Sequence, residues 1–145
     1  MPAKKKSKTR AAPKTSTTPL VPISVGELVD KITILEIKRR HIADAAKRRN
    51  VATELRLLSQ VLSRLKIKPA LIKKERAGLV VVNGALWEIE DKIRDCERAK
   101  DFGPTFVELA RAVYVTNDKR AALKRAINDR VGSALIEEKS YADYT

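Results

Sequence analysis

Apolar residues return at helical spacing through most of the chain after residue 23, and the first such segment has two apolar faces. At 100° per residue, one stripe between residues 24 and 47 is formed by Leu28, Ile32, Leu35 and Ile42. Ile34 and Ile37 fall on roughly the opposite side of the same helix. We therefore expect two contacts for this helix, the second one with another helix of the chain or with a partner subunit.

The ends of the predicted helices are marked by residues that cap helices or interrupt them. Ser24 followed by Glu27 is a capping-box pattern, which predicts that the first helix begins there. A break at residues 48–50 separates it from a second helix near 51–66, whose seam has 3-4-3 spacing and consists of Leu55, Leu58, Leu62 and Leu65. Pro69 then ends that helix or begins the next one.

The second half of the chain predicts three more helices. Residues 70–100 carry one continuous seam, formed by Leu79, Val82, Leu86, Ile89 and Ile93. The Phe-Gly-Pro run at 102–104 is a stop and a restart. A fourth helix follows, a break is expected at 116–118, and a fifth helix ends at Gly132. These elements predict an all-α domain over residues 23–145, an antiparallel bundle of four to five helices with short connections.

The charge of the chain is concentrated in two segments. Residues 1–22 carry six Lys/Arg and no acid, with Pro, Ser and Thr and few large apolar groups. Such a segment cannot bury enough surface to offset its ordering entropy, so we predict a disordered basic arm. The formal net charge is +13, and residues 38–76 hold thirteen Lys/Arg against three acids. Fields of this kind attract nucleic acid, anionic lipid headgroups or acidic proteins.

The residue types needed for common catalytic and metal sites are scarce. The single cysteine, Cys96, excludes an intramolecular disulfide, and the single histidine, His41, has no partner for a metal site or a triad. None of the six Phe, Trp and Tyr residues is interleaved with the 38–76 cluster, so phosphate-backbone contact is expected rather than base stacking. No apolar stretch approaches a membrane span or a secretory signal, and we expect a cytoplasmic protein. Tyr141 and Tyr144 are candidates for pinning the C-terminal tail to the bundle.

Four segments carry a distinctive pattern, namely SVGELVDKITILEIKRRHI at 24–42, VNGALWEIEDKIRDCE at 82–97, FVELARAVYVTNDKRAALKRAIN at 106–128 and EEKSYADY at 137–144. Together they resemble a family of small proteins from bacteria and their phages that is known only as a domain of unknown function. The resemblance implies an all-helical fold. Because members look like companions of cell-surface sugar transferases, or fusions to them, it also implies a link to that chemistry. Its polar motif positions point to a site between helices: Glu27, Asp30, Lys31, Glu36, Lys38, Trp87, Glu88, Asp91, Arg94, Arg111, Tyr114, Asn117, Asp118, Arg120 and Lys124.

Two main functions from different classes follow, and neither includes a metal or a cofactor. A third interpretation is an adaptor whose basic arm is only a solubilising or docking tail. The first is a non-enzymatic protein, expected to form a homodimer, that binds an anionic polymer with DNA or RNA as the first candidate. Its predicted contact residues are Lys4, Lys5, Lys6, Lys8, Arg10, Lys14, Arg39, Arg40, Lys47, Arg48, Arg49, Lys73 and Lys74. The second is an enzyme or accessory protein of cell-surface sugar metabolism. Its predicted polar pocket between helices is lined by Lys31, Glu88, Arg94, Arg111, Asn117 and Lys124.

Overall fold

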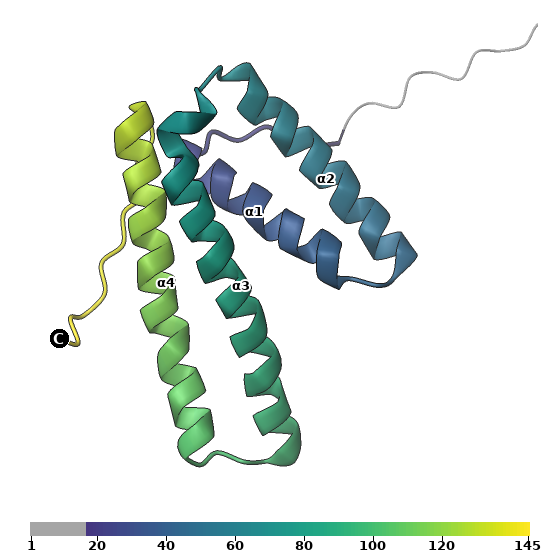
Figure 1. Ribbon diagram of the computed structural model, residues 1–145, viewed down its shortest axis with the longest axis vertical. Helices are drawn as coiled ribbons and strands as arrows, with labels where there is room; N and C mark the ends of the chain where they lie inside the picture. Colours follow the sequence, from purple (N-terminus) through teal and green to yellow (C-terminus); the bar gives the residue numbers. More distant parts are fainter. Residues whose placement is uncertain (1–16) are drawn as a thin grey trace, which may run out of the picture.

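The computed structural model describes residues 17–145, which form four α-helices joined by short connections (Figure 1). The helices are α1 (Val25–His41), α2 (Ala45–Arg64), α3 (Pro69–Ala99) and α4 (Pro104–Val131). The described part of the chain contains no strand, which confirms the all-α prediction. Most of the predicted disordered arm, residues 1–16, lies outside the described residues, and residues 17–24 form no regular secondary structure.

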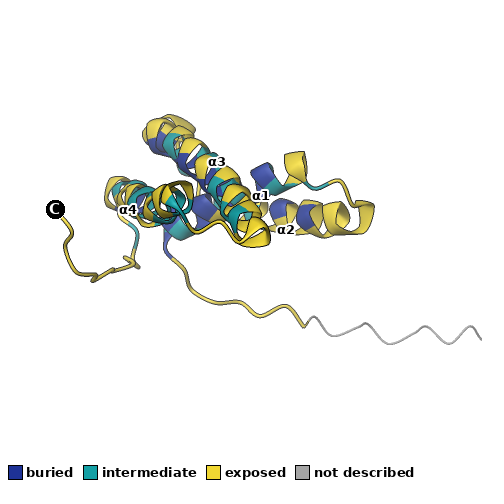
Figure 2. Cartoon of the chain, turned by 90° about the horizontal axis from the view of Figure 1, so that it is seen from below, coloured by how far each residue is buried: buried dark blue, intermediate teal, exposed yellow. Residues whose placement is uncertain are grey.

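Helix α1 lies between α2 on one side and the long antiparallel pair of α3 and α4 on the other (Figure 1). The buried residues gather along these contacts, as the dark blue segments of Figure 2 show. One core cluster joins α1 to α2 and contains Leu28, Ile32, Leu35, Val51 and Leu55. The other joins α1 to α3 and α4 and contains Val29, Ile72, Leu79, Val82 and Ile127. Helix α1 is therefore the element that both parts of the core share.

Both apolar faces predicted for the first helix are covered within one chain. Ile37, on the second face, is 3% exposed, and Ile34 is half-buried beside α3 and α4. The second contact of this helix is thus made with other helices of the same chain. A partner subunit is not needed to cover that face, and the homodimer stays a prediction.

Two predicted breaks differ from the structure. The first break lies at 42–44 instead of 48–50, because the Asp44 carboxylate accepts a hydrogen bond from the Lys47 amide at 2.8 Å and caps α2. The break predicted at 116–118 is wrong, because α4 continues through these residues. Packing of α4 along α3 outweighs the weak local preference of Asn and Asp for turns.

The other predicted boundaries are confirmed. Pro69 and Pro104 begin α3 and α4, where the missing N–H of proline would have no helical partner anyway. The Ser24 hydroxyl accepts a hydrogen bond from the Glu27 amide at 3.2 Å and caps α1. Gly132 ends α4 with φ 65°, a left-handed conformation that glycine adopts without strain.

The C-terminal tail, residues 133–145, folds back along α4. The Tyr144 hydroxyl donates a hydrogen bond to Asp118 at 2.6 Å, and its ring packs edge-on against Tyr114. Nearer to the end of α4, the Glu138 carboxylate accepts a hydrogen bond from Arg125 at 3.0 Å. The expected pinning of the tail is therefore confirmed for Tyr144, whereas Tyr141 is 79% exposed.

Replacing Tyr144 with phenylalanine is expected to loosen the tail, because the hydrogen bond to Asp118 is lost while the ring contact remains. Trypsin should then cleave after the exposed Lys139 severalfold faster under native conditions. Tyr141→Phe is the matched control and should be cleaved like the wild type. Equal cleavage rates for both variants would show that the Tyr144 hydroxyl does not hold the tail.

Candidate functional site

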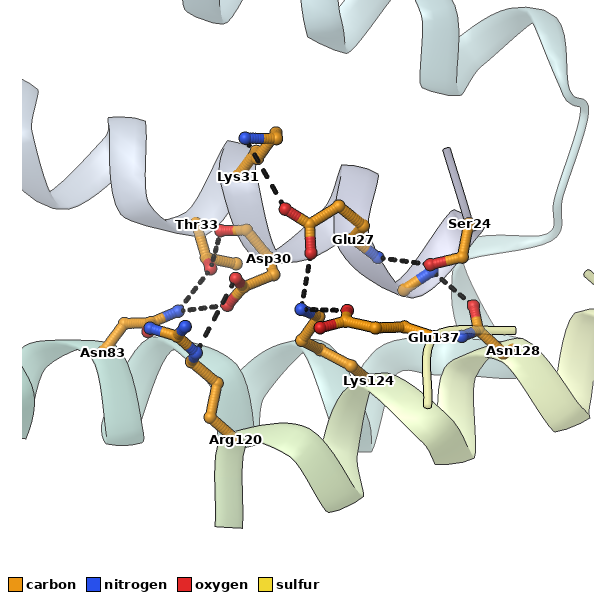
Figure 3. Close-up of polar contacts among 11 residues, drawn as sticks. Ser24, Glu27, Asp30, Lys31, Thr33, Asn83, Arg120, Lys124, Asn128 and Glu137 are labelled. Atoms are coloured by element: carbon orange, nitrogen blue, oxygen red, sulfur yellow. Dashed lines mark hydrogen bonds and ion pairs between the residues drawn. The ribbon is translucent and has the colours of Figure 1, made fainter. Parts of the chain in front are cut away.

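A layer of buried polar side chains lies where α1 meets α3 and α4 (Figure 3). Asp30 and Thr33 are 2% and 0% exposed on the inner face of α1. The side-chain amide of Asn83, on α3, donates hydrogen bonds to Asp30 Oδ1 at 2.8 Å and to Thr33 Oγ1 at 3.0 Å. Because buried polar groups are costly unless they are paired, this triad fixes the position of α1 against α3.

Arg120 approaches the same carboxylate from α4. Its Nε lies 3.9 Å from Asp30 Oδ2, which is close enough for an ion pair and too long for a hydrogen bond. That Nε is buried and has no hydrogen-bond partner among the described residues. The guanidinium therefore balances the charge of Asp30 while keeping hydrogen-bonding capacity.

Lys124, one turn further along α4, is a buried cation held by two carboxylates. Its Nζ lies 2.5 Å from Glu27 Oε2 and 2.6 Å from Glu137 Oε2. Partial burial raises the pKa of Glu27, but the hydrogen bonds and charges of Lys124 and Lys31 outweigh it and hold that pKa below 4.5. Burial lowers the pKa of Lys124, and its two carboxylates outweigh this and raise it above 10.5. Lys124 thus links α1, α4 and the tail.

A hollow of about 540 Å³ lies beside the buried polar layer, and we call it the inter-helix hollow. Its apolar wall consists of Ile34, Leu86 and Trp87, and its polar wall includes Asn83, Asp91, Arg94, Asn117 and Arg120. A second hollow of about 920 Å³ lies between α4 and the tail and includes Tyr114 and Tyr144. Asn117 and Arg120 line both, so these two residues of α4 stand between the hollows.

The six residues predicted to line a pocket are only partly brought together. Arg94 and Asn117 do line the inter-helix hollow, whereas Lys124 is occupied by its two carboxylates. The remaining three are exposed, two of them in ion pairs along their own helices: Lys31 with Glu27, and Glu88 with Lys92. Arg111 is the third.

The predicted pocket set omitted Asn83, Trp87 and Arg120, which the structure places in the hollow. Trp87 and Arg120 were among the polar positions of the family pattern, which was the available signal. Asn83 lies one position off the apolar seam of α3, so helical spacing alone leaves open whether it faces the core. Its role depends on Asp30, which lies 53 residues earlier in the chain.

Eleven of the thirteen cations of the 38–76 cluster fall into two groups at opposite ends of α2. The turn group flanks the α1–α2 connection and consists of Lys38, Arg39, Arg40, Lys47, Arg48 and Arg49. The α3 group lies near the start of α3 and consists of Arg64, Lys66, Lys68, Lys73 and Lys74. The 20 residues of α2 separate the groups by about 30 Å. The predicted arm contacts, Lys4, Lys5, Lys6, Lys8, Arg10 and Lys14, lie outside the described residues.

Ion pairing separates the cluster from the other cations of residues 17–145. Outside 38–76, nine of twelve Lys/Arg pair with a carboxylate: Lys31, Lys92, Arg94, Arg98, Lys100, Arg120, Lys124, Arg125 and Arg130. Inside 38–76, one of thirteen does so, Arg76 with Glu36 at 3.0 Å. One of the three acids of the cluster, Glu75, is itself taken by Arg130 at 2.8 Å. The cluster thus presents cations that no described carboxylate neutralises.

An aromatic side chain from α3 packs against His41 at the end of α1, which directly follows three cations of the turn group in the sequence. The ring of Trp87 is 5.1 Å from that of His41, measured between centroids, and the two planes are tilted by 37°. His41 follows Arg40 directly and ends α1, where its Nδ1 lies 2.9 Å from the Ile37 carbonyl oxygen. No Phe, Trp or Tyr lies within the cluster along the sequence, but the fold brings Trp87 into contact with His41 of this segment. Trp87 also lines the inter-helix hollow, so it connects the hollow to the turn group.

Comparisons with known proteins give one match. A sequence model described as a family of unknown function (DUF6165) matches residues 20–144, which confirms the resemblance to an uncharacterised family. No curated protein and no solved structure matched the chain. Among residues 17–145, none of the helices combines the length and the apolar character that crossing a membrane requires.

Proposed function

The chain belongs to the DUF6165 family of unknown function, and we propose that it binds an anionic polymer, with nucleic acid as the first candidate. The observation that supports this is the difference in ion pairing between the cluster and the remaining described cations. Lys and Arg that serve only solubility are normally interspersed with acids. Twelve cations of one continuous stretch of chain pair with no carboxylate among residues 17–145, which favours a partner that supplies the negative charge.

Cations without a carboxylate partner are suited to contact the phosphates of a nucleic acid. Each cation that neutralises a phosphate releases counterions condensed on the polymer, and this release drives binding at low salt. Cations that already pair with a carboxylate contribute less, because the partner carboxylate repels the phosphate. The two groups at the ends of α2, together with the six cations of the arm, are the contacts that we propose.

The alternative, a pocket protein of cell-surface sugar metabolism, has less support. The six residues predicted for it are scattered, and only Arg94 and Asn117 line the inter-helix hollow. Lys124, the most buried cation of the set, is occupied by Glu27 and Glu137. The hollow itself is retained as a candidate binding site, with residues other than those predicted.

Binding of a labelled DNA duplex to the full-length protein should weaken steeply with salt. Removing unpaired cations should reduce this salt dependence more than removing cations that pair with a carboxylate. Replacing Arg48, Arg49, Lys73 and Lys74 with Gln should flatten log K against log salt by about 2 to 3.5, since each duplex phosphate contact contributes about 0.9. Fluorescence anisotropy over a salt series measures the slope. Deleting residues 1–20 measures how much of the salt slope comes from the arm.

The matched control removes the same charge from paired cations, by replacing Lys92, Arg98, Lys100 and Arg125 with Gln. These exposed pairs contribute little to stability, so the control should fold normally and keep the wild-type slope. Equal slopes for the two variants would mean that net charge, and not the cluster, governs binding. If the wild type binds neither DNA nor RNA at low salt, nucleic acid is the wrong partner.

A further inference from the structure

We propose that the polymer is a single-stranded nucleic acid, one base of which stacks on Trp87 and enters the inter-helix hollow while its phosphates lie on the turn group. This inference rests on the proposed function and narrows it. A surface of cations alone would bind any polyanion. The proposed site would instead distinguish a strand with free bases from a duplex.

Trp87 supplies an aromatic ring close to the α1–α2 connection. Its contact with His41 places an indole beside the turn group, whose six cations pair with no described carboxylate. Single-strand binders combine a basic track for the backbone with aromatic rings for the bases. Both components therefore occur side by side at the α1–α2 connection, although Trp87 is 46 residues away from His41 along the chain.

The hollow and the turn group differ in charge. Two acids, Glu90 and Asp91, and two cations, Arg94 and Arg120, line the hollow. Because Arg120 already balances Asp30, the hollow has no excess of positive charge. Arg94 already hydrogen-bonds Glu90 through its guanidinium. A phosphate would be drawn to the turn group instead, and an uncharged group suits the hollow. A nucleotide has both parts, separated by its sugar.

The hollow also contains side chains that can hydrogen-bond to a base. Asn83 uses its amide nitrogen on Asp30 and Thr33, and its Oδ1 has no hydrogen-bond partner among residues 17–145. The side chains of Asn117 and Arg120 line the same hollow. The edges of an unpaired base offer donors and acceptors that such groups recognise. The volume of about 540 Å³ is within the range of small-molecule sites.

A duplex cannot use this site, because its bases are already stacked and paired. Single strands should therefore bind differently from duplexes, which the charge of the cluster alone would not cause. A free nucleotide offers the same base chemistry, so the experiment includes one.

The test uses the emission of Trp87, the only tryptophan of the chain. A 12-nucleotide single strand should quench it, whereas an abasic strand of the same length and a hairpin duplex should bind without quenching. Trp87→Leu should weaken single-strand binding by about 5- to 150-fold and leave duplex affinity and the salt slope unchanged. Trp87→Phe should restore most of the affinity. Phe102→Leu removes an exposed aromatic residue outside the hollow and should bind like the wild type.

The outcomes separate this inference from the proposed function. If Trp87→Leu binds the single strand as tightly as the wild type, with the same salt slope, stacking is refuted and electrostatic binding stands. If adenosine monophosphate quenches Trp87 and the strand does not, the hollow takes free nucleotides and the single-strand inference is overturned. If no nucleic acid binds at low salt, the proposed function fails first and this inference fails with it.

Discussion

Gly26→Ala should lower the free energy of unfolding by about 3 kcal/mol, the largest effect that we expect from a single methyl group in this chain. A Cβ at residue 26 would lie closer than 3.0 Å to the backbone carbonyl of Lys124 and 2.9 Å from the side-chain oxygen of Asn128. A backbone atom cannot rotate away, so α1 and α4 must separate. The buried hydrogen bond from the Gly26 amide to Asn128, now 2.6 Å, is then weakened or lost.

Gly84→Ala is the matched control, because a Cβ there meets nothing within 4 Å in the interior of α3. Alanine favours the helix over glycine, so this variant should gain about 1 kcal/mol. Urea unfolding monitored by circular dichroism measures both changes. A Gly26→Ala variant as stable as the wild type would show that α1 and α4 are not in the close contact described above.

Lys124→Met should destabilise the fold by about 2 kcal/mol at pH 7, because it leaves Glu27 and Glu137 without their shared cation. The full cost of breaking a buried pair is larger, but both carboxylates here are partly in water. Methionine keeps the unbranched shape of the side chain. Lys92→Met, which disrupts an exposed pair with Glu88, should change stability by less than about 0.5 kcal/mol.

The deficit of Lys124→Met should shrink in acid. The pKa of Glu27 in the fold lies below 4.5, so its ion pair stabilises the wild type above pH 4.5 and this contribution is lost as the pH falls through the folded pKa. In the variant, Glu27 has lost its ion pair with Lys124, so its protonation costs less stability. Unfolding curves at pH 7, 5 and 3 should therefore converge. A deficit that stays constant over this range would mean that the variant loses packing rather than charge pairing.

Local signals predicted the helix boundaries marked by Pro and Gly but not those expected from polar residues. Pro69, Pro104 and Gly132 act through their own backbone geometry, so the boundaries they predict do not depend on the rest of the fold. Polar residues such as Asn117 can cap a helix or face a neighbouring one. The position of Asn117 in the inter-helix hollow depends on α1 and α3, which a local pattern does not contain.

The roles of residues in the candidate site depend even more on contacts between distant parts of the chain. Arg120 and Lys124 are one turn apart on α4, and both belong to the family pattern. Glu27 and Glu137, 97 residues before and 13 residues after Lys124, neutralise that lysine and leave Arg120 facing the hollow. In the same way, composition gave the total charge of residues 38–76, while only the fold showed that Glu75 pairs with Arg130 outside the cluster.

The contacts that hold α1 in place come from late in the chain. The acceptor of the Gly26 amide is Asn128, 102 residues further along the chain. At roughly 5–20 residues per second, Asn128 is synthesised about 5 to 20 s after Gly26. Helices α1 and α2 already share a core cluster and can pair in the meantime. The inner face of α1, with Asp30 and Thr33, is solvated until then. We expect α1 and α2 of the nascent chain to form a two-helix hairpin first. The fold is completed when α4 has been synthesised and packs against α1.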